Sequence, residues 1–175
     1  MINNEELLAV VDEYDQLLEP MPRHEAFAKG HYRRTAHVWI VNEKGEILCQ
    51  KRSMQKDQSP GFWEPAIAGH IGPNDNYFTG ALREVREETG LPIEITDLRL
   101  VKIYKDEVRR EYCAVFYCIW DTKIHEVQSE EAEVERVKLI PTKTVKRHLL
   151  YNKNRETKWV IPQYAKEMFS HFSSA

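Results

Sequence analysis

The chain has 175 residues, a mass of 20.7 kDa and a formal net charge of -3, with 42% hydrophobic and 30% charged residues. This length predicts one domain over residues 1–175. The composition excludes disordered, collagen-like and low-complexity chains, and the slightly acidic balance argues against a nucleic-acid partner.

The N-terminal segment 5–18 allows two readings. Its apolar residues fit one face of a helix, but the run Leu7–Val11 followed by polar residues also fits a strand and a turn. Periodicity alone does not decide between the two. Two prolines end the segment, and His24–Lys29 is predicted to form a short helix that stops at Gly30.

A hairpin is predicted next, because the apolar strands Thr35–Val41 and Glu46–Lys51 flank the turn sequence Asn-Glu-Lys-Gly. A loop follows over 53–64. Further strands are predicted at 65–71, 98–105, 111–120 and 134–140, and helices at 76–89, 141–151 and 162–172. This mixture predicts an α/β or α+β sandwich with a C-terminal helical segment over about 141–173.

The apolar runs and the cysteines bear on location. The longest apolar run, Tyr112–Trp120, is nine residues long, whereas a membrane-spanning helix needs roughly 20. The first residues are acidic where a signal peptide would be basic. We therefore expect a cytoplasmic protein with no membrane partner.

The three cysteines are expected to be buried free thiols, because their odd number and the lack of a CxxC pair fit neither a disulfide framework nor a zinc site.

Three glutamates of the helix predicted at 76–89 share one face. Glu84 lies three and four residues before Glu87 and Glu88, so the side chains converge. Like charges at this spacing repel, which suggests a cation between them, and oxygen-only ligands suit Mg²⁺ or Mn²⁺. On spacing alone, a solvated acidic face is the simpler explanation.

The longer stretch from Gly69 to Leu91 resembles the signature of the Nudix hydrolases, G-x5-E-x7-R-E-U-x-E-E-x-G-U, where U is a bulky aliphatic residue. The matching residues are Gly69, Arg83, Glu84, Val85, Glu87, Glu88, Gly90 and Leu91. Asp75 replaces the first glutamate and Asn74 the glycine before it. The upstream pieces TAHVWIVNEKGEILCQKRSMQK, PGFW and AGH are similar to the branch that includes isopentenyl diphosphate isomerase, so the resemblance covers roughly residues 5–120.

The resemblance implies an α/β/α sandwich around a mixed sheet, with an N-terminal β-hairpin extension over about 5–30 that favours the strand reading of the first segment. It implies that Glu84, Glu87 and Glu88 are catalytic and bind Mg²⁺ or Mn²⁺. The Gly69 carbonyl and Glu111 would complete the metal site. A surface glutamate at a strand end explains Glu111 equally well. The acidic run 126–135 offers rival ligands but is more simply a solvated loop.

The resemblance also implies the substrate-binding residues. Arg52 and Lys56 match an R-x3-K pattern that holds diphosphate oxygens, and cations of this kind neutralise phosphate. A charged loop is the alternative. Arg83 is expected beside them, where it mainly orients the glutamates. Residues expected to be structural are His37, His70 and Trp39, and the basic residues between 143 and 158 are expected to form a solvated face.

Three functions follow from these residues. The preferred one is Mg²⁺-dependent hydrolysis of a diphosphate bond in a nucleoside diphosphate derivative, with a small-molecule diphosphate as partner. The second is isomerisation of a prenyl diphosphate, which by resemblance needs an acid/base cysteine where this chain has Ile67. The third is a non-catalytic nucleotide-binding domain. A homodimer stays open.

Overall fold

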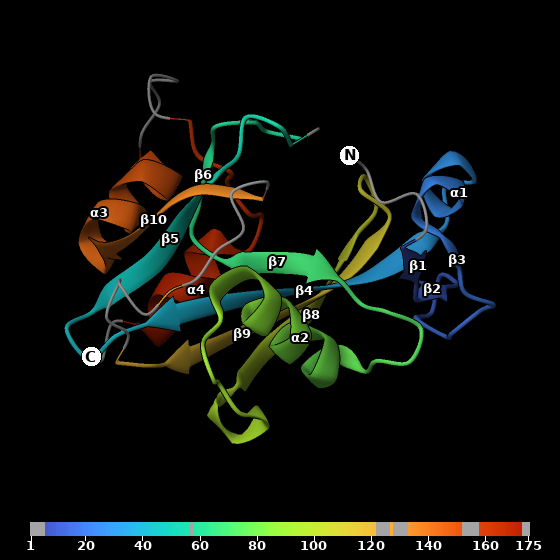
Figure 1. Ribbon diagram of the computed structural model, residues 1–175, viewed down its shortest axis with the longest axis horizontal. Helices are drawn as coiled ribbons and strands as arrows, with labels where there is room; N and C mark the ends of the chain where they lie inside the picture. The colour runs from blue at the N-terminus through green and yellow to red at the C-terminus, as the bar shows by residue number, and fades with distance from the viewer. Residues whose placement is uncertain (1–5, 57, 122–126, 128–132, 152–157, 173–175) are drawn as a thin grey trace.

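The computed structural model describes residues 6–56, 58–121, 127, 133–151 and 158–172, and Figure 1 shows them as a ribbon. A mixed sheet forms the centre of the fold, in the strand order β10-β5-β4-β9-β8. These strands are β4 (Tyr32–Val41), β5 (Glu46–Arg52), β8 (Arg99–Asp106), β9 (Glu111–Ile119) and β10 (Val134–Pro141). Strands β4 and β9 run parallel and the other pairs antiparallel, which confirms the predicted mixed sheet.

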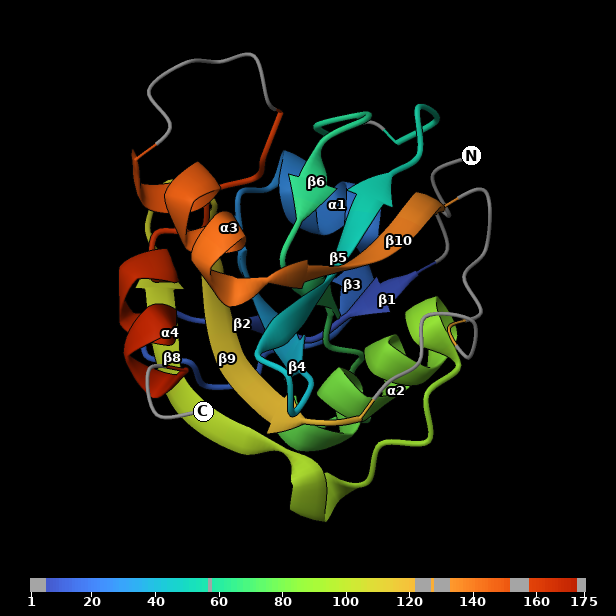
Figure 2. The same cartoon turned by 90° about the vertical axis from the view of Figure 1, so that its left-hand side faces the viewer.

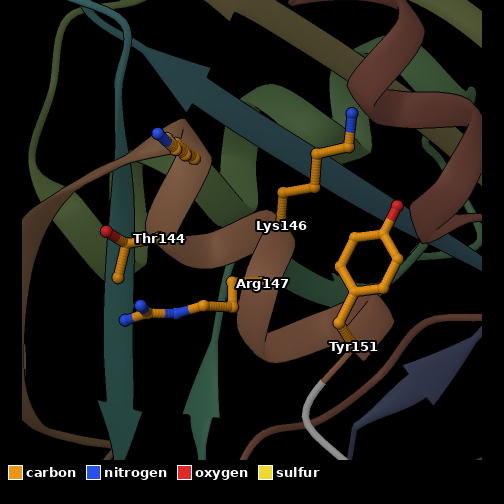
Figure 3. Close-up of a pocket in the computed structure, with 5 residues that line it drawn as sticks. Thr144, Lys146, Arg147 and Tyr151 are labelled. Carbon is orange, nitrogen blue, oxygen red and sulfur yellow. The ribbon is translucent and has the colours of Figure 1, made fainter.

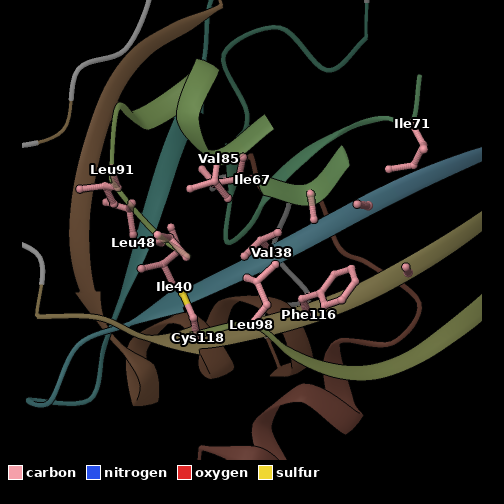
Figure 4. Packing of buried hydrophobic residues seen from close by; sticks show 14 of the residues in the cluster. Val38, Ile40, Leu48, Ile67, Ile71, Val85, Leu91, Leu98, Phe116 and Cys118 are labelled. Atoms are coloured by element: carbon pink, nitrogen blue, oxygen red, sulfur yellow. The ribbon is translucent and has the colours of Figure 1, made fainter. Parts of the chain in front are cut away.

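Helices cover both faces of this sheet, as Figure 2 shows for α2 (Tyr77–Thr89) and α4 (Ala165–His171). Alternate residues of β4 point to opposite faces. Val38 and Ile40 enter the core under α2, where Figure 4 shows them beside Val85 and Phe116. Trp39 enters the second core with residues of α4. The predicted α/β/α layering is therefore confirmed.

Helix α2 forms where the sequence predicts it. The Asn76 side chain accepts hydrogen bonds from the backbone N–H groups of Phe78 and Thr79, and the Thr79 hydroxyl accepts one from the Asn76 N–H. This capping box satisfies N–H groups that the first helical turn leaves free. Gly90 ends the helix with φ 68°, which only glycine adopts without strain.

The N-terminal segment is extended. Strand β1 (Leu7–Leu8) pairs with β3 (Met21–Pro22), while β2 (Val10–Val11) pairs with β4 at the side of the main sheet. A backbone bridge between Val11 and Leu17 closes the turn. The strand-and-turn reading is confirmed and the helical one is wrong, because these apolar residues find sheet partners. The predicted short helix is present as α1 (Arg23–Ala28).

The remaining segments differ from expectation in detail. The predicted loop 53–64 ends in a short strand, β6 (Trp63–Glu64), that pairs with β5, and β7 (Ile67–His70) pairs with β4. A short 3-10 turn, Ile95–Asp97, leads into β8. The predicted helix 141–151 is instead α3 (Thr142–Lys146) followed by a π turn over Arg147–Tyr151, and α4 begins three residues after the predicted start.

The cysteines are free and buried, as predicted. Across the parts of the chain that the structure describes, no helix is long and apolar enough to cross a membrane.

Candidate active site

The three glutamates of α2 line a cavity of about 200 Å³ together with Glu133, which precedes β10. The helix therefore presents Glu84, Glu87 and Glu88 on one face, as their spacing predicts. The same cavity lies beside strands β5 and β7, because Glu88 contacts Gln50 and Glu84 contacts Gly69.

Glu84 is 8% exposed and lies directly over Gly69. A Cβ atom at position 69 would fall 2.0 Å from the Glu84 carboxyl carbon, so only glycine leaves room for this carboxylate. Arg83 pairs with Glu84 at 2.8 Å. Burial raises the pKa of Glu84 to about 7, against the opposing effect of Arg83.

Glu88 accepts a hydrogen bond of 2.8 Å from the Gln50 side-chain amide. Burial raises the pKa of Glu88 to about 8; the Gln50 hydrogen bond opposes this shift, and repulsion from Glu84 and Glu64 adds to it. Two neighbouring carboxylates of α2 thus lack enough positive charge around them. A bound cation would favour their charged forms.

Arg83 connects helix α2 to the loop before it. It donates to the His70 carbonyl at 2.7 Å, to Asp75 at 3.2 Å and to Glu87 at 2.9 Å. Asp75 also accepts from the Thr79 hydroxyl at 3.0 Å. The shorter carboxylate at position 75 therefore still reaches the arginine.

Glu111 does not line the cavity. It pairs with the buried Arg33 at 3.1 Å, and Arg33 stacks over Phe27 with its guanidinium carbon 3.9 Å from the ring centre. Burial raises the pKa of Glu111, and Arg33 opposes the shift. Its role as a metal ligand stays a prediction.

Glu133 belongs to the acidic run 126–135, which offers rival ligands to Glu111 but is explained more simply as a solvated loop. It supplies a fourth carboxylate to the cavity. Residues 126, 128–132 of that run lie outside the described residues. The only sequence signal was the run itself, and its composition does not show which glutamate turns inward.

The two predicted diphosphate-binding cations are already paired with carboxylates. Lys56 forms an ion pair with Glu133, and its charge acts on Glu64 and Glu88, so it lies at the cavity. Arg52 pairs with the buried Glu64 at 2.9 Å and donates to the Gln58 carbonyl at 2.8 Å. Glu64 was not singled out from the sequence.

His37 and His70 are both largely buried, and their structural role stays a prediction. His37 bonds to the Tyr164 hydroxyl, and burial lowers the pKa of His37 to about 4 and that of His70 to about 3.

A second cavity, of about 380 Å³, lies on α3 and the following turn. Figure 3 shows that Arg147 points away from Lys146 and Tyr151, so the three side chains do not converge on one ligand.

The donor set fits a hard divalent cation. Its members are carboxylate oxygens and the Gly69 carbonyl, the ligand types that Mg²⁺ and Mn²⁺ prefer. Among the described residues, no three acidic, histidine or cysteine side chains already surround one point. Arg83 pairs with Glu84, so a bound cation would share that carboxylate with Arg83, whereas Gln50 donates to one oxygen of Glu88, Oε2, and a carboxylate has a second oxygen that can bind a cation.

The NUDIX domain model matches residues 31–161 of the chain. The chain belongs to the Nudix hydrolase family. An uncharacterized Nudix hydrolase of Pseudomonas aeruginosa is 31% identical over 131 residues, which are 75% of this chain and 77% of that protein. An isopentenyl-diphosphate Delta-isomerase of Kocuria rhizophila is 32% identical over 123 residues, 66% of this chain and 62% of the isomerase.

Solved structures support the Nudix fold. A crystal structure from Deinococcus radiodurans aligns with a TM-score of 0.71 at 15% identity and covers 96% of this chain and 99% of its own. A bifunctional NMN adenylyltransferase/ADP ribose pyrophosphatase of Francisella tularensis, complexed with AMP and a manganese ion, aligns with a TM-score of 0.56 at 13% identity, over 81% of this chain and 41% of its own.

Proposed function

We propose that this Nudix domain hydrolyses a diphosphate bond in a nucleoside diphosphate derivative, with Mg²⁺ or Mn²⁺ as cofactor. The carrying observation is the convergence of Glu84, Glu87 and Glu88 on one cavity, with Glu84 seated on Gly69. The Francisella enzyme named as an ADP ribose pyrophosphatase, solved with manganese, supports the substrate class and the cofactor.

The residues divide the work by chemistry. Glu84, Glu88 and the Gly69 carbonyl would hold the cation, with Glu87 and Glu133 at the rim of the cavity. When bound, the cation supplies charge neutralisation on the diphosphate and a water of lowered pKa. Lys56 and Arg52 would bind the non-bridging diphosphate oxygens and keep the scissile bond over the glutamates. Arg83 holds the loop before α2 against the helix.

Prenyl diphosphate isomerisation is the second candidate, because relatives named isomerases match this chain. The site lacks its proton donor. Ile67 is 1% exposed in the apolar core, and its neighbours Ala66 and Ala68 carry no titratable group either. We therefore propose hydrolysis, which needs only a bound water, a cation and a diphosphate.

A turnover screen tests the proposal. Purified protein with Mg²⁺ is assayed for release of phosphorylated products from nucleotide sugars, dinucleoside polyphosphates, nucleoside triphosphates and nucleotide coenzymes. Isopentenyl diphosphate is included for conversion to the dimethylallyl isomer. Hydrolysis that disappears in Glu84→Gln supports the proposal. Efficient isomerisation with no hydrolysis in the whole screen contradicts it.

A further inference from the structure

Two buried polar residues lie between the predicted diphosphate-binding arginine and the metal-binding glutamates, and the hydrolysis outlined above does not use them. Gln50 is 4% exposed and Glu64 is 8% exposed. They stand directly opposite each other where β5 pairs with β6. Directly opposite residues of an antiparallel pair share a face of the sheet, and this is the face under α2.

Gln50 and Glu64 contact different ends of the site. Gln50 donates from its amide to Glu88 at 2.8 Å, and Glu64 accepts from Arg52 at 2.9 Å. The Gln50 amide also stabilises the charged form of Glu64. A continuous chain of polar groups therefore connects Arg52, Glu64, Gln50 and Glu88.

We propose that Gln50 and Glu64 are positioning residues, which hold Glu88 toward the cavity at one end and Arg52 toward the diphosphate at the other. The inference rests on the proposed function, because it assigns Glu88 to the cation and Arg52 to the substrate. It adds two residues outside the glutamate-rich helix, Gln50 for the metal-binding end of the site and Glu64 for the diphosphate-binding end.

The free-energy cost of burying Gln50 and Glu64 favours a role in orienting their neighbours over a role in stabilising the fold. Burying an amide and a carboxylate is unfavourable unless every polar atom is satisfied. The Gln50 carbonyl oxygen is buried, and no described group donates to it. Two apolar side chains of similar size would fill the same space without that cost. Apolar side chains could not fix the direction of the Glu88 carboxylate and of the Arg52 guanidinium. A hydrogen-bond partner outside the metal ligands supplies such orientation at a metal site.

Two variants separate the ends of the chain. Gln50→Met keeps the length of the side chain and removes the donor to Glu88. Glu64→Gln keeps the shape and removes the charge that holds Arg52. Lys51→Met is the matched control, because Lys51 points to the opposite face of the same strand and pairs with Glu135 at the surface. Should Gln50→Met not fold, Gln50→Asn retains the amide and shortens its reach.

The readouts are Mn²⁺ affinity of the substrate-free protein, measured by electron paramagnetic resonance, and KM and kcat for the best diphosphate of the screen. Loss of an outer partner of a metal ligand typically costs about 10–100-fold in metal affinity or activity. We expect Gln50→Met to weaken Mn²⁺ binding by at least about tenfold and to lower kcat, with KM little changed. Glu64→Gln should raise KM by about tenfold and leave Mn²⁺ affinity close to wild type. Lys51→Met should match wild type in both.

Several outcomes would overturn the inference. If both variants lower only the melting temperature and keep wild-type Mn²⁺ affinity and KM, the pair is merely structural. A lower KM in Glu64→Gln would show that Glu64 competes with the substrate for Arg52 and does not position it. If the wild-type protein hydrolyses nothing but binds Mn²⁺ with an affinity that Gln50→Met lowers, the proposed function is refuted and the role of Gln50 in positioning Glu88 is supported. Wild-type protein that does not bind Mn²⁺ refutes both.

Discussion

Replacement of Gly69 by alanine tests whether the placement of Glu84 matters for turnover. The new Cβ atom would lie 2.0 Å from the carboxyl carbon and from one oxygen of Glu84. Carbon atoms in ordinary contact are about 3.5 Å apart, so the carboxylate has to move by more than about 1 Å. It is the end of a flexible side chain, so the backbone can stay in place. A displacement of about 1 Å at a reacting centre can cost about 10²-fold.

We therefore expect Gly69→Ala to lower kcat/KM about 100-fold while the free energy of unfolding changes by less than about 1 kcal/mol. Steady-state hydrolysis with Mg²⁺ and urea unfolding measure the two quantities. Gly80→Ala is the contrasting control, because its Cβ would lie 2.4 Å from the Ile71 side chain in the core. Overpacking typically costs about 1–3 kcal/mol, so this variant should lose stability and keep its turnover per folded molecule. Wild-type turnover in Gly69→Ala would refute the assignment of Glu84.

Three further predictions concern the same site. Glu84→Gln and Glu88→Gln keep shape and remove charge, so hydrolysis should fall by orders of magnitude while the fold persists; near-normal turnover in both would contradict the metal site. Burial raises the pKa of Glu84 to about 7 and that of Glu88 to about 8, so near neutral pH the folded state holds protons that the unfolded state has lost. With EDTA present, the free energy of unfolding should therefore fall by about 2 kcal/mol as the pH rises from 6.5 to 8. Urea titrations would show the decline in wild type and a smaller one in Glu84→Gln; a flat wild-type profile would argue against it. Isopentenyl diphosphate should not be isomerised efficiently, because Ile67 has no proton to transfer, and product analysis after incubation with Mg²⁺ checks this.

The sequence predicted elements whose signals are local. Helix α2 is such an element, because its cap at Asn76, its apolar face and its stop at Gly90 all lie within one segment. The hairpin of β4 and β5 is another. The N-terminal strands are not, because Leu7–Val11 is extended only where β3 and β4 offer hydrogen-bond partners from elsewhere in the chain. The sequence alone could not supply that information.

The candidate site divides in the same way. The glutamates of α2 could be predicted, because helical spacing alone brings them together. Glu64 and Gln50 could not, because their pairing depends on the register between β5 and β6. Glu111 is a different case. The resemblance assigns it to the metal site, and the register between β4 and β9, which the sequence could not supply, places Arg33 beside it; its role as a ligand stays a prediction.

The charge balance of the site predicts how metal and substrate binding depend on each other. Around the cavity, the described acidic residues Glu64, Asp75, Glu84, Glu87, Glu88 and Glu133 outnumber the cations Arg52, Lys56 and Arg83, and each of these cations already pairs with one of them. A diphosphate is itself an anion, so a metal-free site would repel it.

We therefore expect a nucleoside diphosphate derivative to bind at least about tenfold more weakly in EDTA than with Mg²⁺, and Mg²⁺ to raise the melting temperature without substrate. Calorimetric titration measures this affinity, with Ca²⁺ in place of Mg²⁺ to keep the divalent charge while slowing hydrolysis. Equal affinity with and without the divalent cation would show that Arg52 and Lys56 hold the diphosphate by themselves. The excess of carboxylates would then have no role in substrate binding.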